Sequence, residues 1–248
     1  MDENGPVNVG EYTVRTWNDE YHGTTTMTKI LEHSSNVGMV YVGGKLGKEK
    51  LIGFLKQFGI GTPTGIDLEE ESSPLLRPER DWSEIDLATA SFGQGIAVTP
   101  IQMVRAVAAL ANGGALMEPH VVAQIDDKGR SVSIKPKKVR QVISPTTSRI
   151  ITEMMVAAVD NGEAKWAKPA GYRIAGKTGT AQIPVSGHYD KDKTIASFVG
   201  FAPADDPKFV MLVTLREPST SPWGSETAAP LFFAIARDLF SYWGISPQ

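Results

Sequence analysis

The sequence predicts a mixed α/β (α+β) fold in which helices flank an antiparallel sheet. Apolar residues recur every three to four positions through much of the first two thirds of the chain, as in helices that bury one face. The last third instead carries three strand-like segments, two of which are joined by the short turn 203–207. Helices first, neighbouring strands later and a closing helix are typical of this layered arrangement.

The helices are expected from apolar spacing and start signals. The run 24–41 has helical spacing but is interrupted by the Ser-Ser-Asn triplet 34–36, whose residues prefer caps and turns, so two helices should meet there. Another helix should begin at Thr99, where Thr-Pro-Ile-Gln combines an N-cap, a proline at the first position and a capping-box glutamine. The remaining helices are expected over residues 48–58, 145–161 and 225–242.

Strands are expected where β-branched and aromatic residues cluster between turn signals. The stretch 59–81 is turn-rich and predicts a surface excursion, whereas 121–134 predicts a hairpin that turns at 127–129. The three sheet strands are expected over residues 172–183, 194–201 and 209–215.

Composition narrows the function classes. The chain has 248 residues, 41% of them apolar, and a net charge of −3, which indicates one globular domain without the basic surface of a nucleic-acid binder. It has no cysteine, which excludes thiolate metal sites and a cysteine nucleophile. No metal or other cofactor is expected, because the histidines lack paired ligand spacing; they are His22, His33, His120 and His188.

The segment Gly176–Ala181, with the sequence Gly-Lys-Thr-Gly-Thr-Ala, carries the clearest chemical signal. Glycine weakens a strand interior unless another backbone must approach closely. An ammonium and two hydroxyls between small residues would suit an anionic substrate lying along a strand edge, with Lys177, Thr178 and Thr180 meeting its carboxylate. A glycine-rich bulge with a solvated lysine is the alternative. The triplet 34–36 is most simply a helix cap, and gains chemical meaning only if Ser34 and Asn36 face Lys177 across a cleft.

Ser-x-Asn followed far downstream by Lys-Thr-Gly on a strand resembles the serine penicillin-recognising enzymes. The chain looks most like the transpeptidase domain of a class B penicillin-binding protein of the division or elongation type, with a β-lactamase/transpeptidase-like fold. The resemblance covers nearly the whole chain. It extends through the segments 91–95, 98–103, 111–114, 197–203 and 228–232.

The resemblance implies roles for individual residues. Ser34 would relay a proton, Asn36 would bind the amide of the donor peptide, and Lys177 would set the electrostatics of the cleft. Thr178, Gly179 and Thr180 would bind the substrate or β-lactam carboxylate, and the Thr180 N–H would serve as an oxyanion donor. The implied ligands are peptidoglycan stem peptides and β-lactams, and the implied location is the extracytoplasmic face of the bacterial cytoplasmic membrane.

The family nucleophile is missing from this sequence. It lies in a Ser-x-x-Lys motif before Ser-x-Asn, but no serine here has lysine three positions later. Thr26 does have Lys29 at that spacing, but the run 24–29 resembles the ordinary helix leading into Ser-x-Asn. We therefore expect residues 1–248 to be the C-terminal part of a single transpeptidase domain, beginning after the nucleophile, without an anchor or signal segment and inactive alone. The alternative is a nucleophile-free module that binds cell-wall peptide or a division or elongation protein.

One loop and one surface remain as expectations. His188, Asp190, Lys191 and Asp192 would form either a gate over the cleft or a solvated hairpin loop. The absent segment would contain a helix packed beside the Ser-x-Asn helices, so its loss would uncover more apolar surface than a monomer tolerates.

We therefore expect a homodimer, a domain-swapped assembly or a local rearrangement near residues 1–45. Sedimentation velocity of the purified chain tests this expectation, since self-association gives a concentration-dependent coefficient. A compact monomer at every concentration, with residues 1–45 ordered, would contradict it.

Overall fold

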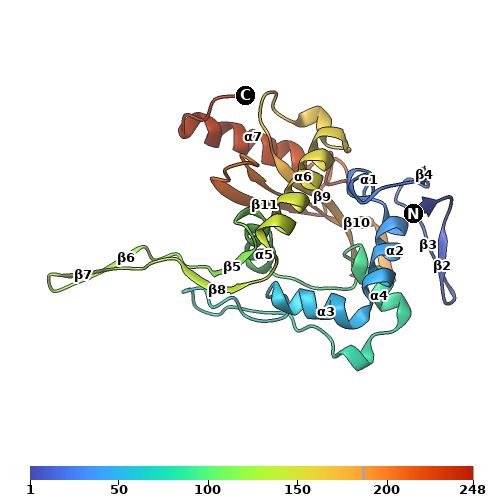
Figure 1. Ribbon diagram of the computed structural model, residues 1–248, viewed down its shortest axis with the longest axis horizontal. Helices are drawn as coiled ribbons and strands as arrows, with labels where there is room; N and C mark the ends of the chain where they lie inside the picture. Colours follow the sequence, from blue (N-terminus) through green and yellow to red (C-terminus); the bar gives the residue numbers. More distant parts are fainter. Residues whose placement is uncertain (186–187, 248) are drawn as a thin grey trace.

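An antiparallel sheet of three strands, in the order β11-β10-β9, forms the centre of the computed structural model (Figure 1). The structure describes residues 1–185 and 188–247, without the side chains of residues 185–192. Val199, on the central strand, pairs with Lys177 on one side and Leu212 on the other. The strands are β9 (Ala175–Val185), β10 (His188–Ala202) and β11 (Phe209–Arg216).

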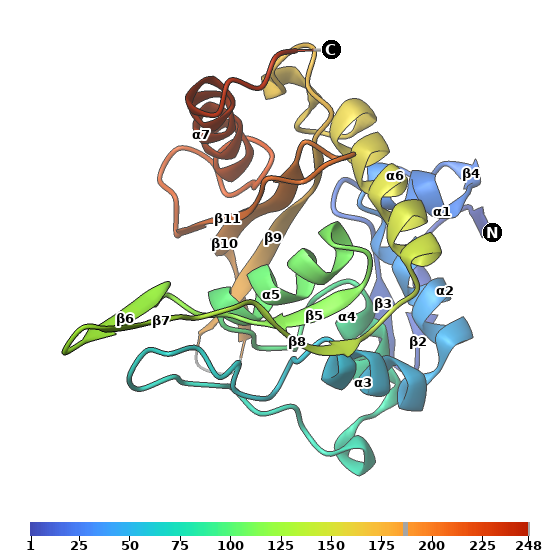
Figure 2. The ribbon, with the colours of Figure 1, turned by 60° about the vertical axis from the view of Figure 1, so that its left-hand side comes forward.

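Helices cover both faces of this sheet, as Figure 2 shows. Helix α7 (Ala228–Tyr242) packs on one face, while α5 (Pro100–Ala111) and α6 (Pro145–Asn161) pack on the other. Because side chains alternate along a strand, Phe198 points into the α7 cluster and Phe201 into the cluster of α5 and α6. The expected fold class, an antiparallel sheet flanked by helices, is confirmed.

The α7 face holds a cluster of fully buried aromatic rings. Phe198 lies 4.6 Å from Phe232 and 5.1 Å from Phe233 between ring centroids, and Phe240 stacks on Tyr172 at 4.1 Å. Such pairs add to the free energy gained by removing the rings from water. This cluster holds α7 against the sheet, on the face opposite α5 and α6.

The expected pair of N-terminal helices is present as α1 (Met27–Glu32) and α2 (Asn36–Leu46). The second helix runs five residues beyond the expected end at 41, because Gly43 serves tight packing against α4 (Glu84–Ser91) rather than a helix end. A Cβ at position 43 would lie 1.8 Å from the Ser91 hydroxyl oxygen. Helix α4 itself was not expected, although Ser83 and Asp86 form a capping box at its start.

Most other elements lie near their expected positions. The capping box at Thr99 and the hairpin turn between Asp127 and Arg130 are confirmed, and α7 begins three residues after the expected 225. The hairpin projects away from the body of the molecule (Figure 1). Eight further strands precede α1 or lie between α5 and α6. They are β1 (Asp2–Glu3), β2 (Val7–Val9), β3 (Tyr12–Val14), β4 (Gly23–Thr24), β5 (Ala115–Glu118), β6 (Gln124–Asp127), β7 (Arg130–Ser133) and β8 (Lys137–Gln141). The short helices are α3 (Lys48–Gln57), η1 (Glu79–Asp81) and η2 (Lys165–Ala167).

The segment considered as a gate belongs in part to the sheet. The expected strands 172–183 and 194–201 left residues 184–193 as the loop between them. The backbone of residues 188–192 instead forms the start of β10. The side chains of His188, Asp190, Lys191 and Asp192 lie outside the described residues. Within the described part of the chain, the helices are too short or too polar for any of them to cross a bilayer.

Truncating a buried ring of the α7 cluster should destabilise the fold strongly. Phe232→Ala is expected to lower the free energy of unfolding by about 3–5 kcal/mol, because the cavity it leaves is lined by rings that cannot collapse into it. Tyr242→Ala on the same helix is the matched control; its side chain is 82% exposed, and it should cost less than about 0.5 kcal/mol. Urea unfolding measures both, and equal losses would contradict this account of the core.

Candidate active site

The lysine of β9 and the serine between α1 and α2 meet in the structure. Lys177 Nζ donates to Ser34 Oγ at 2.9 Å, although the two residues are 143 positions apart in the sequence. The ammonium also donates to the backbone and hydroxyl oxygens of Thr178, at 3.1 and 3.2 Å. The sheet and the helical region thus contribute one group each to a single hydrogen-bonded pair.

The glycines of this strand allow close packing rather than a bulge. A Cβ at Gly176 would lie 2.5 Å from the Phe198 ring, and one at Gly179 would lie 2.5 Å from the Ser197 hydroxyl oxygen. Pairing with β10 is continuous from Ala175 to Gln182. The alternative of a glycine-rich bulge with a solvated lysine is therefore wrong, since β9 is regular here and the half-buried Lys177 donates its hydrogen bonds to Ser34 and Thr178.

Burial changes the proton affinity of Lys177. Removal of the ammonium from water lowers the pKa of Lys177 to about 8, and the negative charge of Glu163 partly opposes this shift. The amine can consequently exist in both protonation states near neutral pH. An amine of this kind can exchange a proton with the serine hydroxyl that it contacts.

The residues of the triplet 34–36 make different contacts. Ser34 adopts a left-handed backbone conformation with φ of 51°, which a non-glycine residue rarely adopts. Ser35 caps α2 by accepting from the Gly38 N–H at 2.8 Å, and it donates to buried Glu3 at 2.6 Å. The expected helix cap is therefore real, but Ser35 supplies it, which leaves the Ser34 hydroxyl for Lys177.

Asn36 and the two threonines border the same cavity as this pair. The Asn36 side-chain nitrogen donates to the Arg15 carbonyl oxygen at 3.0 Å, which orients its amide at the first turn of α2. Thr180 Oγ1 accepts from the Gly224 N–H at 3.0 Å. All six residues singled out in the sequence line this cavity; they are Ser34, Asn36, Lys177, Thr178, Gly179 and Thr180.

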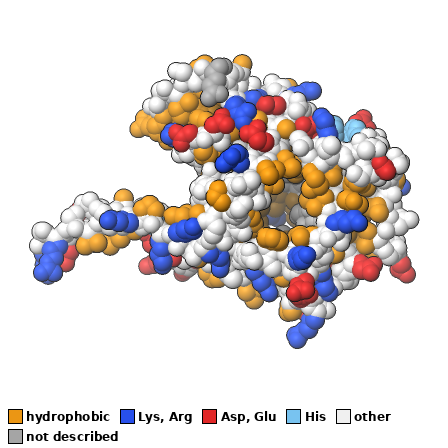
Figure 3. Space-filling view, in the orientation of Figure 1, with side chains coloured by type: hydrophobic (Ala, Val, Ile, Leu, Met, Phe, Trp, Pro, Cys, Tyr) orange, Lys and Arg blue, Asp and Glu red, His pale blue; other side chains and the backbone are white. Residues whose placement is uncertain are grey.

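The cavity has a volume of about 740 Å³, and its lining combines the polar residues of the site with a larger set of apolar side chains. Figure 3 shows a hollow in the middle of the molecule with hydrophobic side chains around it. The apolar wall comes from α1, α2, α5, the loop before α5 and strands β10 and β11. Its members include Ile30, Met39, Ile96, Val98, Met103, Ile195, Val199 and Leu212.

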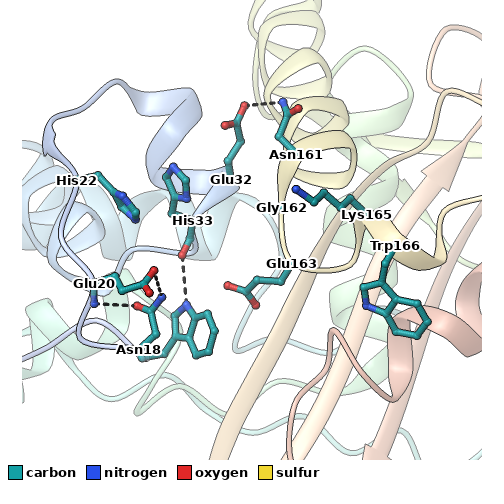
Figure 4. A pocket seen from close by; sticks show the side chains of 11 residues that line it. Asn18, Glu20, His22, Glu32, His33, Asn161, Gly162, Glu163, Lys165 and Trp166 are labelled. Carbon is teal, nitrogen blue, oxygen red and sulfur yellow. Dashed lines mark hydrogen bonds between the residues drawn. The ribbon is translucent and has the colours of Figure 1, made fainter.

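Three lining residues were missed by the sequence analysis. Trp17 and Trp223 approach each other edge to face at 5.1 Å between ring centroids, and both border the cavity. Glu163 follows the end of α6 and borders both this cavity and a second one of about 440 Å³ (Figure 4). An isolated tryptophan or glutamate outside a motif gives no sequence signal, because only the fold brings it to the site.

No metal site accompanies these groups in the part of the chain that the structure describes. Within it, no group of three or more histidine, aspartate or glutamate side chains is placed to hold a metal ion. The chemistry that the described site offers is hydrogen bonding, proton transfer and binding of an anion.

Comparison with known proteins agrees with this geometry. The family model for the penicillin-binding protein transpeptidase domain matches residues 2–238. The chain belongs to this family. It is 40% identical over 250 residues to Stage V sporulation protein D of Bacillus subtilis, covering 99% of this chain, and 32% identical over 242 residues to the peptidoglycan D,D-transpeptidase FtsI homolog of Mesostigma viride, covering 90%. The suspected class B resemblance is thereby confirmed.

A solved structure supports the family's fold along the entire chain. Penicillin-binding protein 3 of Mycobacterium tuberculosis, complexed with aztreonam, superimposes with a TM-score of 0.90 at 31% identity, covering all of this chain and 58% of the other. The chain spans only 39% of the length of the Bacillus relative and 40% of that of the Mesostigma relative. This transpeptidase-family chain therefore matches one region of longer proteins.

The buried lysine should make stability depend on pH. The pKa of Lys177 is about 8 in the folded chain and 10.5 for a free lysine, so the unfolded state binds more protons between these values and stability rises with pH there. Relative to Lys177→Met, the native free energy of unfolding should increase by about 2 kcal/mol between pH 7 and pH 10.

Urea unfolding of the native chain and Lys177→Met at both pH values measures this difference. Lys193→Met is the control, because Lys193 is an exposed lysine in the first half of β10. A constant difference between the native chain and Lys177→Met across this pH range would show that Lys177 is not desolvated.

Proposed function

We propose that this chain forms the Ser-x-Asn and Lys-Thr-Gly walls of a class B peptidoglycan D,D-transpeptidase active site. The 2.9 Å contact between Lys177 Nζ and Ser34 Oγ, beside the two threonine hydroxyls, is the observation that supports it best. Residues 1–248 would then be the C-terminal part of one catalytic domain that works on the extracytoplasmic side of the cytoplasmic membrane.

The proposed reaction is acyl transfer between stem peptides. A serine oxygen attacks the carbonyl carbon of the penultimate D-Ala, and the terminal D-Ala leaves with a proton on its amine. The amine of a second peptide then attacks the resulting ester, which forms the cross-link and returns a proton to the serine. β-Lactams would enter the same cleft and acylate the same serine when their ring amide opens.

Each residue of the site has a proposed part in this reaction. The Ser34 hydroxyl, held by Lys177, passes the proton between the attacking serine and the leaving amine. Asn36 binds the amide of the donor peptide, and the hydroxyls of Thr178 and Thr180 bind the terminal carboxylate. The Thr180 N–H stabilises the oxyanion of the tetrahedral intermediate.

The attacking serine must come from sequence outside residues 1–248, because no Ser-x-x-Lys lies within them. We propose that the segment carrying it packs against the apolar wall of the 740 Å³ cavity, directly beside Ser34 and Lys177. That placement would bring a serine hydroxyl to Ser34 and Lys177 while covering the apolar wall of the cavity. The chain alone would then bind ligands without forming an acyl-enzyme, since removing the nucleophile of such a site costs on the order of 10⁶ in kcat.

The absent Ser-x-x-Lys also favours a second candidate function. A nucleophile-free relative could hold stem peptide or a division or elongation protein without chemistry. The reading frame upstream of the codon for Met1 separates the two candidates, because only the enzyme requires an encoded Ser-x-x-Lys there.

The purified chain should bind ampicillin reversibly and form no adduct in intact-mass spectrometry. Ampicillin should shift the amide signals of residues 178–180, and Thr178→Val and Thr180→Val should each weaken binding about tenfold, because each removes a hydrogen bond to a charged carboxylate. Thr147→Val, on the exposed start of α6, is the matched control.

Two results would contradict the proposed function in different ways. Covalent labelling of the chain alone would show that it holds a nucleophile of its own. Ampicillin binding that survives both strand substitutions would place the ligand away from the Lys-Thr-Gly wall.

A further inference from the structure

Charge is distributed very sparsely over the cavity of the Lys177–Ser34 pair. Of the described residues that line it, only two carry a formal charge, the cation Lys177 and the anion Glu163. The hydrogen bonds of the ammonium go to Ser34 and Thr178, so the carboxylate is not in direct contact with it. The nearest opposite charge therefore matters most for this ammonium, because Glu163 is the only anionic side chain among the described residues that line the cavity.

The backbone places Glu163 firmly at this wall. Its neighbours Gly162 and Ala164 are both buried. A Cβ at position 162 would lie 2.3 Å from the carbonyl oxygen of Ala158 and 3.0 Å from that of Glu32, so the end of α6 lies directly against the end of α1. Figure 4 shows the Glu163 carboxylate pointing into the space between these elements, away from Trp166.

The carboxylate is held there with unused hydrogen-bonding capacity. Its Oε1 atom is buried and has no hydrogen-bond partner among the described residues. Burial raises the pKa of Glu163, while Lys177 and the Trp17 indole lower it. Burying an unsatisfied carboxylate oxygen is unfavourable unless a nearby charge compensates for it.

We propose that Glu163 is a positioning residue whose carboxylate keeps the Lys177 amine charged and directed at Ser34. The proposal rests on the function proposed above, because it assigns Glu163 to the proton relay of that site. Glu163 does not touch substrate; it acts through Lys177. When Ser34 passes its own proton to the leaving amine it takes one from Lys177, and when the second amine attacks, the proton returns through Ser34 to the lysine; the negative charge of Glu163 favours this return.

Other titratable groups around Glu163 leave it as the main charge that acts on the pKa of Lys177, after the effect of burial. Burial and its stacked neighbour His22 lower the pKa of His33, so this imidazole is neutral at pH 7. Glu32 has its own partners, Lys29 and Asn161. The titratable side chains that line the two cavities together with Glu163 are Glu20, His22, Glu32, His33, Lys165 and Lys177.

Titration of Lys177 by NMR tests the proposal without any substrate. The chain is labelled with ¹³C at lysine Cε, and the Lys177 signal is identified by its absence in Lys177→Arg. Glu163→Gln should move the titration midpoint of Lys177 down by about 1 pH unit, because the nearest opposite charge is removed at constant size. Glu163→Asp, which keeps the charge, should retain most of the native midpoint.

The control is Glu20→Gln, because Glu20 lines the second cavity but not the one that holds Lys177. It should leave the Lys177 midpoint where it is. Glu163→Met serves as a second neutral variant, and circular dichroism shows which variants fold. An unchanged Lys177 midpoint in any folded neutral variant would overturn the proposal, and so would an equal shift in Glu20→Gln. Neither result would change the outcome expected of the ampicillin experiment, which tests the proposed function separately.

Discussion

The site depends on holding an ammonium largely out of water and against a serine hydroxyl. A buried lysine is costly, so the surrounding elements must be rigid enough to keep it in place. The rigidity comes from the α7 face of the sheet. There the Phe198 ring packs directly against Gly176, and Phe232 and Phe233 of α7 pack against Phe198. A side chain at position 176 would collide with this layer, and one at position 179 would collide with the Ser197 hydroxyl of β10. The aromatic core and the small residues of the strand are thus two parts of one constraint on the position of Lys177.

The serine side of the contact is fixed by a different set of interactions. Ser34 has an unfavourable backbone conformation and lies between the two helix caps, His33 at the end of α1 and Ser35 at the start of α2. The cap residue Ser35 is itself tied to Glu3, which is 1% exposed, so the N-terminal strands take part in placing Ser34. Residues near the beginning of the chain therefore influence a contact made 30 residues later with a strand near residue 177.

The sheet strands and the helices with clear caps could be predicted from the sequence, because each leaves a local pattern. The meeting of Ser34 with Lys177 was expected only through the family resemblance, because no local pattern joins residues 143 positions apart. Helix α4 was missed although Ser83 and Asp86 signal its start, since the turn-rich stretch before it drew the expectation of a surface excursion. The extension of α2 could not be predicted, because glycine at 43 disfavours a helix locally and only packing against Ser91 explains it. Glu163 and the tryptophans reach the site through tertiary structure alone, which no spacing rule describes.

The distance between the two charges of the cleft is itself informative. A carboxylate bonded directly to the ammonium would hold its protons and compete with Ser34 for them, and the lysine would then serve as a structural ion pair. A carboxylate that is near but not bonded still favours the charged amine through space, while the N–H groups remain directed at the serine and threonine oxygens. Such an arrangement gives an amine with a pKa of about 8 that can give up a proton and regain it. For the proposed proton relay, the separation of Glu163 from Lys177 is therefore as much a requirement as the contact of Lys177 with Ser34.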